Sequence, residues 1–242
     1  MQVLNSNLGC VSMANLVVDP AFWDLFPDAQ INTLTVHGLN NTVDESQDPH
    51  FQALLDDAMA KSHQYLTEDT FRNNPVVAQW RDAYSKFKKK KGARSSIEAL
   101  LKRVDQGKTL SPINPLVDVY NSVSLEFGVP CGGEDLAAID GPMHLGVAKG
   151  GEAFKPLCVD EDEPALPGEV IYYDKIGAVC RCFNWRDGER TMLTEKTTDA
   201  ILVIEAINEE QRVRQAEAVT TMKERLQTEF GVDADVDTFT VA

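Results

Sequence analysis

The sequence predicts an α+β fold, because helical patterns fill its first half, strand patterns follow, and a long helix comes near the end. Strands do not alternate regularly with helices, as they would in a chain of βαβ units. The 242 residues contain no internal repeat and no low-complexity linker, so we expect one domain at 16–242 after a flexible N-terminus at 1–15. Its expected parts are an N-terminal α/β part (16–92), a core (93–207) and a C-terminal helix (208–231).

The first part of the chain combines short helices with one strand. The segment INTLTV at 31–36 alternates apolar and polar residues, which is typical of a half-buried strand. Apolar residues at three- and four-residue spacing predict the helices, which we expect at 22–26, 51–65 and 76–87.

The central part has the clearest helix signals. Ser95 and Glu98 form a capping box, in which each side chain satisfies a free backbone N–H at the start of a helix. A second helix is expected after Asn114, a good N-cap, with Pro115 at the first helical position. The glycine-rich segment 130–135 is then expected to be a loop that lets a ligand approach the main chain.

Strands and a final helix complete the prediction. The run AILVIEA at 200–206 is almost wholly apolar, as expected for a buried strand. A helix follows at 208–230 and ends at Gly231. Further strands are expected at 143–148, 170–173 and 178–183.

Composition narrows the class of protein. The hydrophobic fraction of 43% and the charged fraction of 25% are those of ordinary globular proteins, and no apolar run is long enough to cross a bilayer. None of the five cysteines forms a C-x-x-C pair, which fits a reducing compartment. We therefore expect a cytoplasmic protein that has no membrane partner.

Charge is unevenly distributed along the chain. The net charge is −15, yet residues 81–108 contain ten basic and three acidic residues, a local charge of +7. A basic island on an acidic body can bind a polyanion locally, whereas the overall charge argues against DNA and unspecific nucleic-acid binding. A solvated loop without a partner is the equally weighted alternative. The residues expected to contact RNA are Lys86, Lys88, Lys89, Lys90, Lys91 and Arg94.

No metal or cofactor site is expected. The four histidines share no metal-ligand spacing, and no phosphate-binding or dinucleotide-binding motif is present. Cys180 and Cys182 place two thiols on one face of a strand. A zinc site there would need further ligands that the sequence does not identify, so packed free cysteines are favoured.

A second polar segment lies at 181–191. It combines three arginines, an asparagine, a tryptophan and two acids around Asp187-Gly188, a strong hairpin signal. One interpretation is a charged turn whose ions pair with each other. The other is a pocket rim whose arginines hold a phosphate or carboxylate and whose acid accepts from a substrate.

These segments together resemble a known domain. The motifs are RSSIEALL at 94–101, NPLVDVYN at 114–121, LE-x-G-x-P at 125–130 and NWRD at 184–187. They resemble the B3/B4 domain of the phenylalanyl-tRNA synthetase beta chain and, more closely, free-standing B3/B4-domain proteins related to it.

The resemblance implies a three-layer α+β fold and a pocket that hydrolyses the ester of a mischarged tRNA with a bound water. It assigns the catalytic positions to Asn121, to Gly132, where the synthetase has a histidine, and to Asp187, nearest to its discriminating glutamate. Mischarged aminoacyl-tRNA is the implied partner. The implied substrate-binding residues are Asp118, Pro130, Cys131, Gly133, Arg181, Asn184, Trp185 and Arg186.

Two other functions stay open. The glycine in place of the histidine is compatible with a non-catalytic module that binds a free amino acid or RNA. An interaction protein with a vestigial pocket is the third possibility. The hydrolase hypothesis requires that the helix carrying Asn121 and the turn at 184–188 line one cavity.

Overall fold

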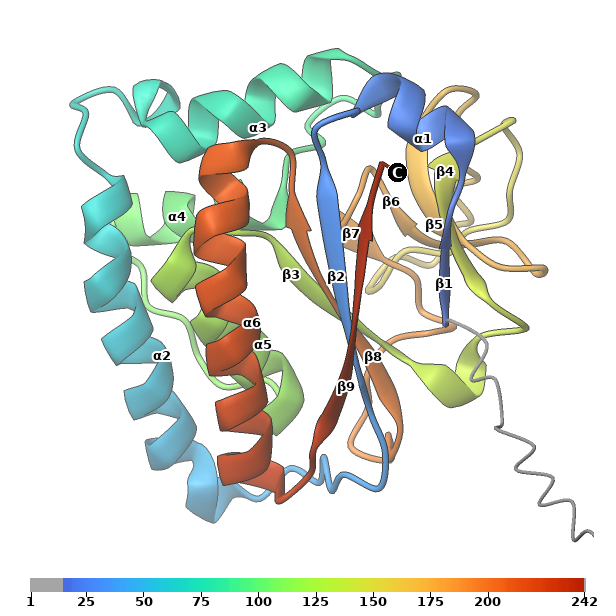
Figure 1. The fold of residues 1–242 in the computed structure, drawn as a ribbon. Helices are drawn as coiled ribbons and strands as arrows, with labels where there is room; N and C mark the ends of the chain where they lie inside the picture. Colours follow the sequence, from blue (N-terminus) through green and yellow to red (C-terminus); the bar gives the residue numbers. More distant parts are fainter. Residues whose placement is uncertain (1–14, 242) are drawn as a thin grey trace, which may run out of the picture.

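The computed structural model describes residues 15–241, which form helices packed against two sheets (Figure 1). The helices are α1 (Pro20–Leu25), α2 (Asp48–Ser62), α3 (Pro75–Ser85), α4 (Ser96–Asp105), α5 (Pro115–Phe127) and α6 (Glu209–Phe230). The strands are β1 (Leu16–Val18), β2 (Gln30–Val36), β3 (Cys131–Asp135), β4 (Met143–Val147), β5 (Val170–Tyr173), β6 (Ala178–Arg181), β7 (Arg186–Asp187), β8 (Ala200–Ala206) and β9 (Ala234–Thr240).

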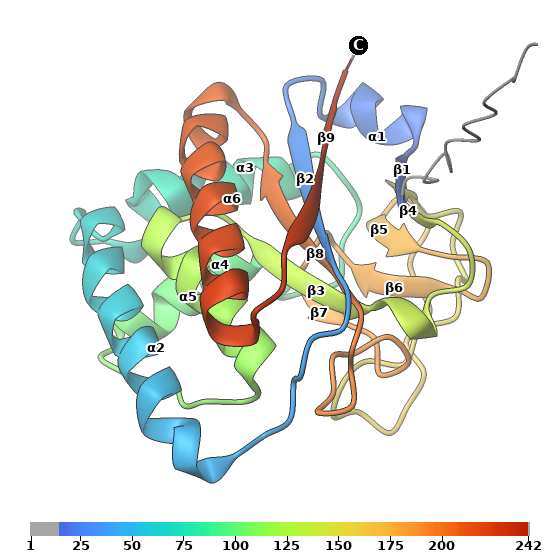
Figure 2. The same ribbon diagram turned by 60° about the horizontal axis from the view of Figure 1, so that its bottom comes forward.

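The strands form two separate sheets. One has the order β3-β8-β2-β9 and is antiparallel throughout. The other has the order β1-β4-β5-β6-β7, in which only the β1–β4 pair is parallel. Strands β3 and β7 are edge strands of their respective sheets, and they lie close together in the view of Figure 2.

The four-stranded sheet is the middle of three layers. On one face, Leu34 and Leu202 pack with Val123 of α5 and Met222 of α6. On the other face, side chains such as Ile31 join a core that includes residues of the five-stranded sheet and of α1, α3 and α4. Because both faces are covered, every residue of β8 is buried. The predicted three-layer α+β architecture is confirmed.

Helix α5 begins as its sequence predicts. The Asn114 Oδ1 atom accepts a hydrogen bond from the Val117 N–H at 3.0 Å, and Pro115 occupies the first turn. Gly128 ends the helix in the left-handed conformation, with φ of 61°. The side chain of Asn41 extends the cap, since it bonds both Asn114 Oδ1 and the Leu116 N–H.

Helix α4 has half of the predicted capping box. The Ser95 hydroxyl accepts from the Glu98 N–H at 3.3 Å. The Glu98 carboxylate instead accepts from the Arg81 guanidinium at 2.7 and 3.0 Å. This ion pair joins α4 to α3, so the tertiary contact replaces the local one.

The prediction of a loop at 130–135 is wrong. Residues 131–135 form β3, which pairs with β8 in antiparallel register. Three further strands, β1, β7 and β9, were not predicted, and β7 lies in the segment that was expected to be a turn. The predicted flexible segment 1–15 lies outside the described residues except for Asn15.

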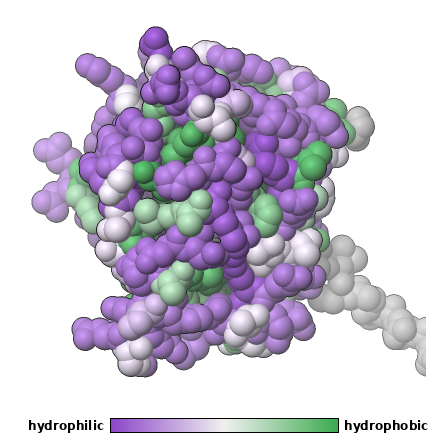
Figure 3. Space-filling model, turned by 90° about the vertical axis from the view of Figure 1, so that its left-hand side faces the viewer, coloured by the Kyte–Doolittle hydropathy of each residue, from purple (hydrophilic) through white to green (hydrophobic). Residues whose placement is uncertain are grey.

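Hydrophilic residues predominate on the face at the left-hand side of Figure 1, where apolar residues form only scattered patches (Figure 3). Within residues 15–241, none of the helices has both the length and the apolarity needed to cross a bilayer.

Candidate functional site

The structure brings the two expected segments to one cavity of about 210 Å³. It lies where α4 and α5 meet β3 and the turn between β6 and β7, and we call it the β3 cavity. Six of the residues named from the sequence line it: Asn121, Cys131, Gly132, Asn184, Trp185 and Asp187. The wall contributed by α4 includes Arg103, and Tyr120 of α5 adds an aromatic ring.

The turn reaches β3 because the chain reverses sharply after β6. Cys182 and Phe183 have positive φ angles of 52° and 56°, which cost an ordinary residue about 1–2 kcal/mol each. Burial of the Phe183 ring offsets this cost. The ring packs edge-on against Phe22, Phe26 and Trp80, with centroids 5.2 to 5.7 Å away.

Gly132 allows the turn to approach β3 closely. A Cβ atom at this position would lie 2.6 Å from Asn184 Oδ1, well inside van der Waals contact. The side-chain amide of Asn184 therefore occupies the space that the side chain of any other residue at position 132 would need.

The Asn184 amide is also poorly satisfied. Its Nδ2 atom is buried without a hydrogen-bond partner in the described part of the chain, and the residue is 8% exposed. Most buried polar groups in proteins are paired, so this unpaired donor, in a residue that lines the cavity, is an exception.

A buried acid that sequence reasoning missed lies beside the cavity. Glu134 is 4% exposed, and the Thr191 hydroxyl lies close enough to lower its pKa but too poorly placed to make a full hydrogen bond to either carboxylate oxygen. Burial, with a contribution from the nearby Asp187, raises the pKa of Glu134 well above its usual range. Side chains alternate along a strand, so recognising 131–135 as a strand would have placed Glu134 on the same face as Gly132.

Asp187 and Cys180 complete this group. Burial raises the pKa of the Asp187 carboxyl, which is half-buried at the cavity wall. The Cys180 thiol donates to the Arg186 carbonyl at 3.0 Å and lies 3.3 Å from Asp187 Oδ1. The reactive atoms of Glu134, Cys180 and Asp187 all lie within 4.8 Å of one another.

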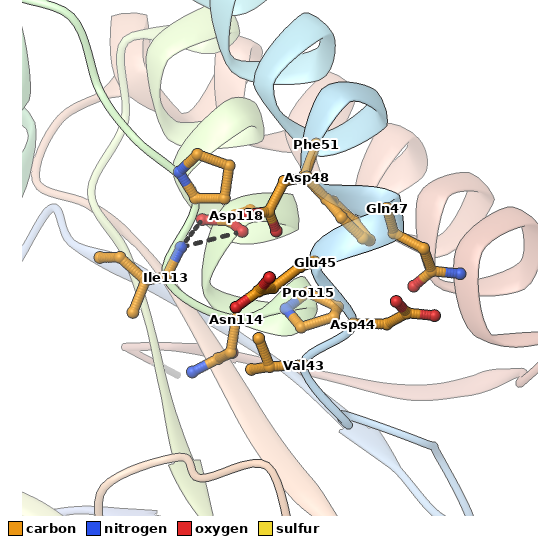
Figure 4. Close-up of a pocket in the computed structure, with 11 residues that line it drawn as sticks. Val43, Asp44, Glu45, Gln47, Asp48, Phe51, Ile113, Asn114, Pro115 and Asp118 are labelled. Atoms are coloured by element: carbon orange, nitrogen blue, oxygen red, sulfur yellow. Dashed lines mark hydrogen bonds between the residues drawn. The ribbon is translucent and has the colours of Figure 1, made fainter.

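Asp118 does not reach the β3 cavity. It lines a separate cavity of about 200 Å³ with Asp44, Glu45 and Asp48, between the start of α2 and the start of α5 (Figure 4). The Asp118 carboxylate accepts from the Ile113 N–H, which ties the preceding loop to α5. Burial raises the pKa of Asp118 to about 6.

Arg181 lies in a buried ion pair. It is 2% exposed, and its guanidinium donates to both carboxylate oxygens of Glu169 at 2.7 and 2.8 Å and to the Glu163 carbonyl. Because neighbouring strand residues face opposite ways, Arg181 points away from the face that carries Cys180. It is therefore not among the residues around the β3 cavity.

Three other expected substrate contacts lie near the cavity without lining it. The Arg186 guanidinium lies over the Trp185 ring, 5.8 Å from its centroid. The Pro130 carbonyl accepts from the Glu205 N–H. Gly133 faces the helical layer, since a Cβ atom there would lie 2.6 Å from Leu202.

Of the six basic residues expected to contact RNA, three interact with other groups of the protein. The ammonium groups of Lys89 and Lys90 bond the Tyr84 carbonyl and the Glu163 carboxylate, respectively. Lys86 lies over the Phe26 ring. The three remaining members, Lys88, Lys91 and Arg94, are exposed.

The basic island continues along α4 toward the β3 cavity. Arg94 and Lys102 line one groove with Arg81, and Arg103 lines the cavity itself. The acids Asp69, Glu98 and Asp105 line the same groove, so its walls carry both signs of charge.

Comparison with known proteins relates most of this chain to one family. A family model for the B3/4 domain matches residues 79–238, which include α4, α5, both walls of the β3 cavity and α6. A 92-residue segment is 39% identical to the phenylalanine–tRNA ligase beta subunit of Nocardia farcinica, covering 38% of this chain and 11% of that protein.

The fold has a solved counterpart. An N-terminal fragment of the phenylalanyl-tRNA synthetase beta subunit from Pyrococcus horikoshii aligns with 90% of this chain and 49% of its own length, with a TM-score of 0.50 and 15% identity. At this identity, the similarity concerns the fold. The chain spans half or less of the length of each of these relatives.

Proposed function

This chain belongs to the B3/4 domain family, and from that premise we propose that it is an editing-type deacylase, which hydrolyses the ester of a mischarged aminoacyl-tRNA. The observation that carries the proposal is the β3 cavity, around which Asn121, Gly132 and Asp187 converge from three separate elements. The names of the relatives supply the substrate class, an amino acid esterified to tRNA.

The cavity has the size and polarity for part of such a substrate. Pockets for drug-sized ligands have volumes of roughly 300–1,000 Å³, so about 210 Å³ suits one amino-acid side chain rather than the whole aminoacyl-adenosine. The adenosine would then lie at the mouth. Trp185 offers a flat surface there for the base.

Ester hydrolysis needs a positioned water and donors for the carbonyl oxygen, on which negative charge develops. Asn121 and the unpaired Asn184 Nδ2 are suitable side-chain donors. The backbone of β3 offers more, because β3 is an edge strand and the Asp135 N–H points outward to the Thr191 carbonyl. By strand alternation, the N–H groups of Cys131 and Gly133 point to the same free edge.

The exposed basic residues support a contact with the tRNA backbone. Lys88, Lys91 and Arg94 precede α4, whose Arg103 lines the cavity. Phosphate contacts of this kind position a nucleic acid without reading its sequence. A tRNA substrate also agrees with the cytoplasmic location expected from the cysteines.

The test is a deacylation assay of the purified chain against a panel of tRNAs, each charged with a wrong amino acid. We expect at least one ester to be hydrolysed faster than in buffer. Asn121→Ala should lower that rate by about 10²-fold, the usual cost of losing one donor at a reacting carbonyl. Glu217→Gln, on the exposed side of α6, is the matched control and should retain the rate. Buffer-level hydrolysis of every ester would end the proposal.

A second candidate rests on Gly132. With no histidine there, and with the Asn184 amide in its place, the cavity could bind a free amino acid without hydrolysing an ester. Saturable thermal stabilisation by one amino acid, without turnover of any ester, would favour this binding module over the deacylase.

A further inference from the structure

We propose that Glu134, Cys180 and Asp187 form a binding site for a thiophilic divalent metal ion, for which Zn²⁺ is the best match. The site would lie beside the β3 cavity and share Asp187 with its wall. The proposal goes beyond ester hydrolysis and does not depend on it. It also replaces the expectation of no metal site, because the structure supplies the partners of Cys180 that the sequence could not identify.

The three side chains are spaced for a common ion. One ligand atom from each lies within 4.8 Å of the other two. Zinc binds sulfur at about 2.3 Å and carboxylate oxygen at about 2.0–2.2 Å, so two ligands of a tetrahedral ion are roughly 3.3–3.7 Å apart. The distance of 3.3 Å between Cys180 Sγ and Asp187 Oδ1 already fits, and the Glu134 carboxylate would rotate toward them. The ligands come from β3, β6 and β7, whose backbones are held by the two sheets.

The cluster lacks the partners that buried acids require. Both Glu134 oxygens are buried, and the Thr191 hydroxyl beside them is a single, poorly placed donor for two oxygens. An unsatisfied buried polar group costs about 1–3 kcal/mol or more. Two arginines lie close in sequence to Cys180 and Asp187, but both are paired with other acids, Arg181 with Glu169 and Arg190 with Asp174. A bound cation would pair with these carboxylates, as buried charges in proteins usually require.

Asn184 supplies an independent sign of a missing ligand. It is not a member of the cluster, yet its buried Nδ2 atom also has no partner in the described residues, and it lines the same cavity as Asp187. A solvent or substrate oxygen on the metal would be a natural acceptor for this N–H group. Asn184 thus adds an unpaired donor in the cavity wall that Asp187 shares with the cluster.

The mixture of ligands selects the ion. Calcium and magnesium prefer six or more oxygen ligands, whereas a thiolate with carboxylates suits zinc. On binding, the Cys180 thiol releases its proton to solvent and gives up its hydrogen bond to the Arg186 carbonyl. Three protein ligands leave a fourth position, which is the arrangement of open rather than structural zinc sites.

The test uses the full chain after removal of metals with a chelator, with Co²⁺ as the spectroscopic probe and Zn²⁺ as competitor. We expect one Co²⁺ per chain, a sulfur-to-cobalt charge-transfer band, and loss of that band on adding one equivalent of Zn²⁺. Cys180→Ser should abolish the band. Cys182→Ser, a buried thiol on the adjacent segment, and Cys158→Ser, an exposed thiol, should keep it.

The carboxylates are tested separately. Glu134→Gln and Asp187→Asn should each weaken Zn²⁺ binding by at least about tenfold while melting near the wild-type temperature without metal. These variants keep the test decisive if Cys180→Ser does not fold. No stoichiometric metal, a band that survives in Cys180→Ser, or a band lost in Cys182→Ser would overturn the site. All readouts are independent of ester turnover, so the deacylase proposal stands or falls separately.

Discussion

Gly132 is the residue on which the shape of the β3 cavity depends most. Gly132→Ala would place a Cβ atom 2.6 Å from Asn184 Oδ1 and displace the amide. We expect a loss of stability of about 1–3 kcal/mol, typical of overpacking, measured by urea denaturation.

The matched control for this change is a double-mutant cycle. Asn184→Ala removes the group with which the new methyl would collide, so Gly132→Ala should cost less in that background. Strictly additive losses in the two single variants and the double variant would show that the two residues do not compete for this space.

Glu205 should make stability depend on pH. It is fully buried and accepts from the Tyr172 hydroxyl at 2.9 Å, and burial raises its pKa from 4.5 to about 8. Between these values the folded state binds more protons than the unfolded state, so the free energy of unfolding falls as pH rises from about 4.5 to about 8.

Glu205→Gln should remove this part of the pH dependence, because the amide can still accept from Tyr172 but does not ionise. The measurement is the free energy of unfolding at several pH values from 5 to 9, with the wild-type chain as control. Parallel curves for the two proteins would mean that Glu205 has an ordinary pKa in the folded state.

At the scale of single elements, the start of α5 is the clearest test of local sequence information. Asn114→Ala removes the acceptor of the Val117 N–H and of the Asn41 amide. The expected cost is about 0.5–2 kcal/mol, measured by chemical denaturation. Asn114→Asp retains an oxygen acceptor for both bonds and should recover most of this loss. Equal stability of the Ala and Asp variants would contradict the capping role.

Elements with strong local signals were predicted well, and those defined by pairing were not. Asn114-Pro115 and Gly128 mark the ends of α5 through contacts within a few residues. Strand β3 contains two adjacent glycines, which disfavour strands, yet the buried β8 provides a ladder for it. Strand β9 has exposed acids along its length and is defined only by its antiparallel partner β2.

At the scale of the whole molecule, the uneven charge distribution predicts which surface would contact the tRNA of the proposed function. Reversing the exposed charges of Lys88, Lys91 and Arg94 together should weaken tRNA binding by at least about tenfold and flatten its salt dependence, because fewer counterions are released. Binding is measured by fluorescence anisotropy at several salt concentrations.

The matched control carries the same change of charge elsewhere on the surface, at Lys149, Lys196 and Lys223, which are also exposed. It should reduce tRNA affinity less than the reversal at the basic island. Equal losses in both variants would mean that only the net charge matters and that the island is not the contact surface.

The β3 cavity shows which site residues the sequence could identify and which it could not. Asn121 and the segment 184–187 were expected to meet, and the structure places them around one cavity. Glu134 was missed because its segment was interpreted as a loop, in which no side-chain direction can be assigned. Arg181 was expected at the substrate but is bound to Glu169, which lies twelve residues away, immediately before β5, and which no local pattern identifies as its partner.

The amino-acid sequence alone was sufficient for the α+β class, for most helices and for the family resemblance, because caps, periodicity and short motifs act over a few neighbouring residues. Which carboxylates and thiols share a buried site depended on the packing of two sheets against each other. Cys180 and Asp187 meet through the local pairing of β6 with β7, whereas Glu134 is brought within 4.8 Å of them by the packing of the other sheet, and burial there shifts the pKa values of the two carboxyl groups upward.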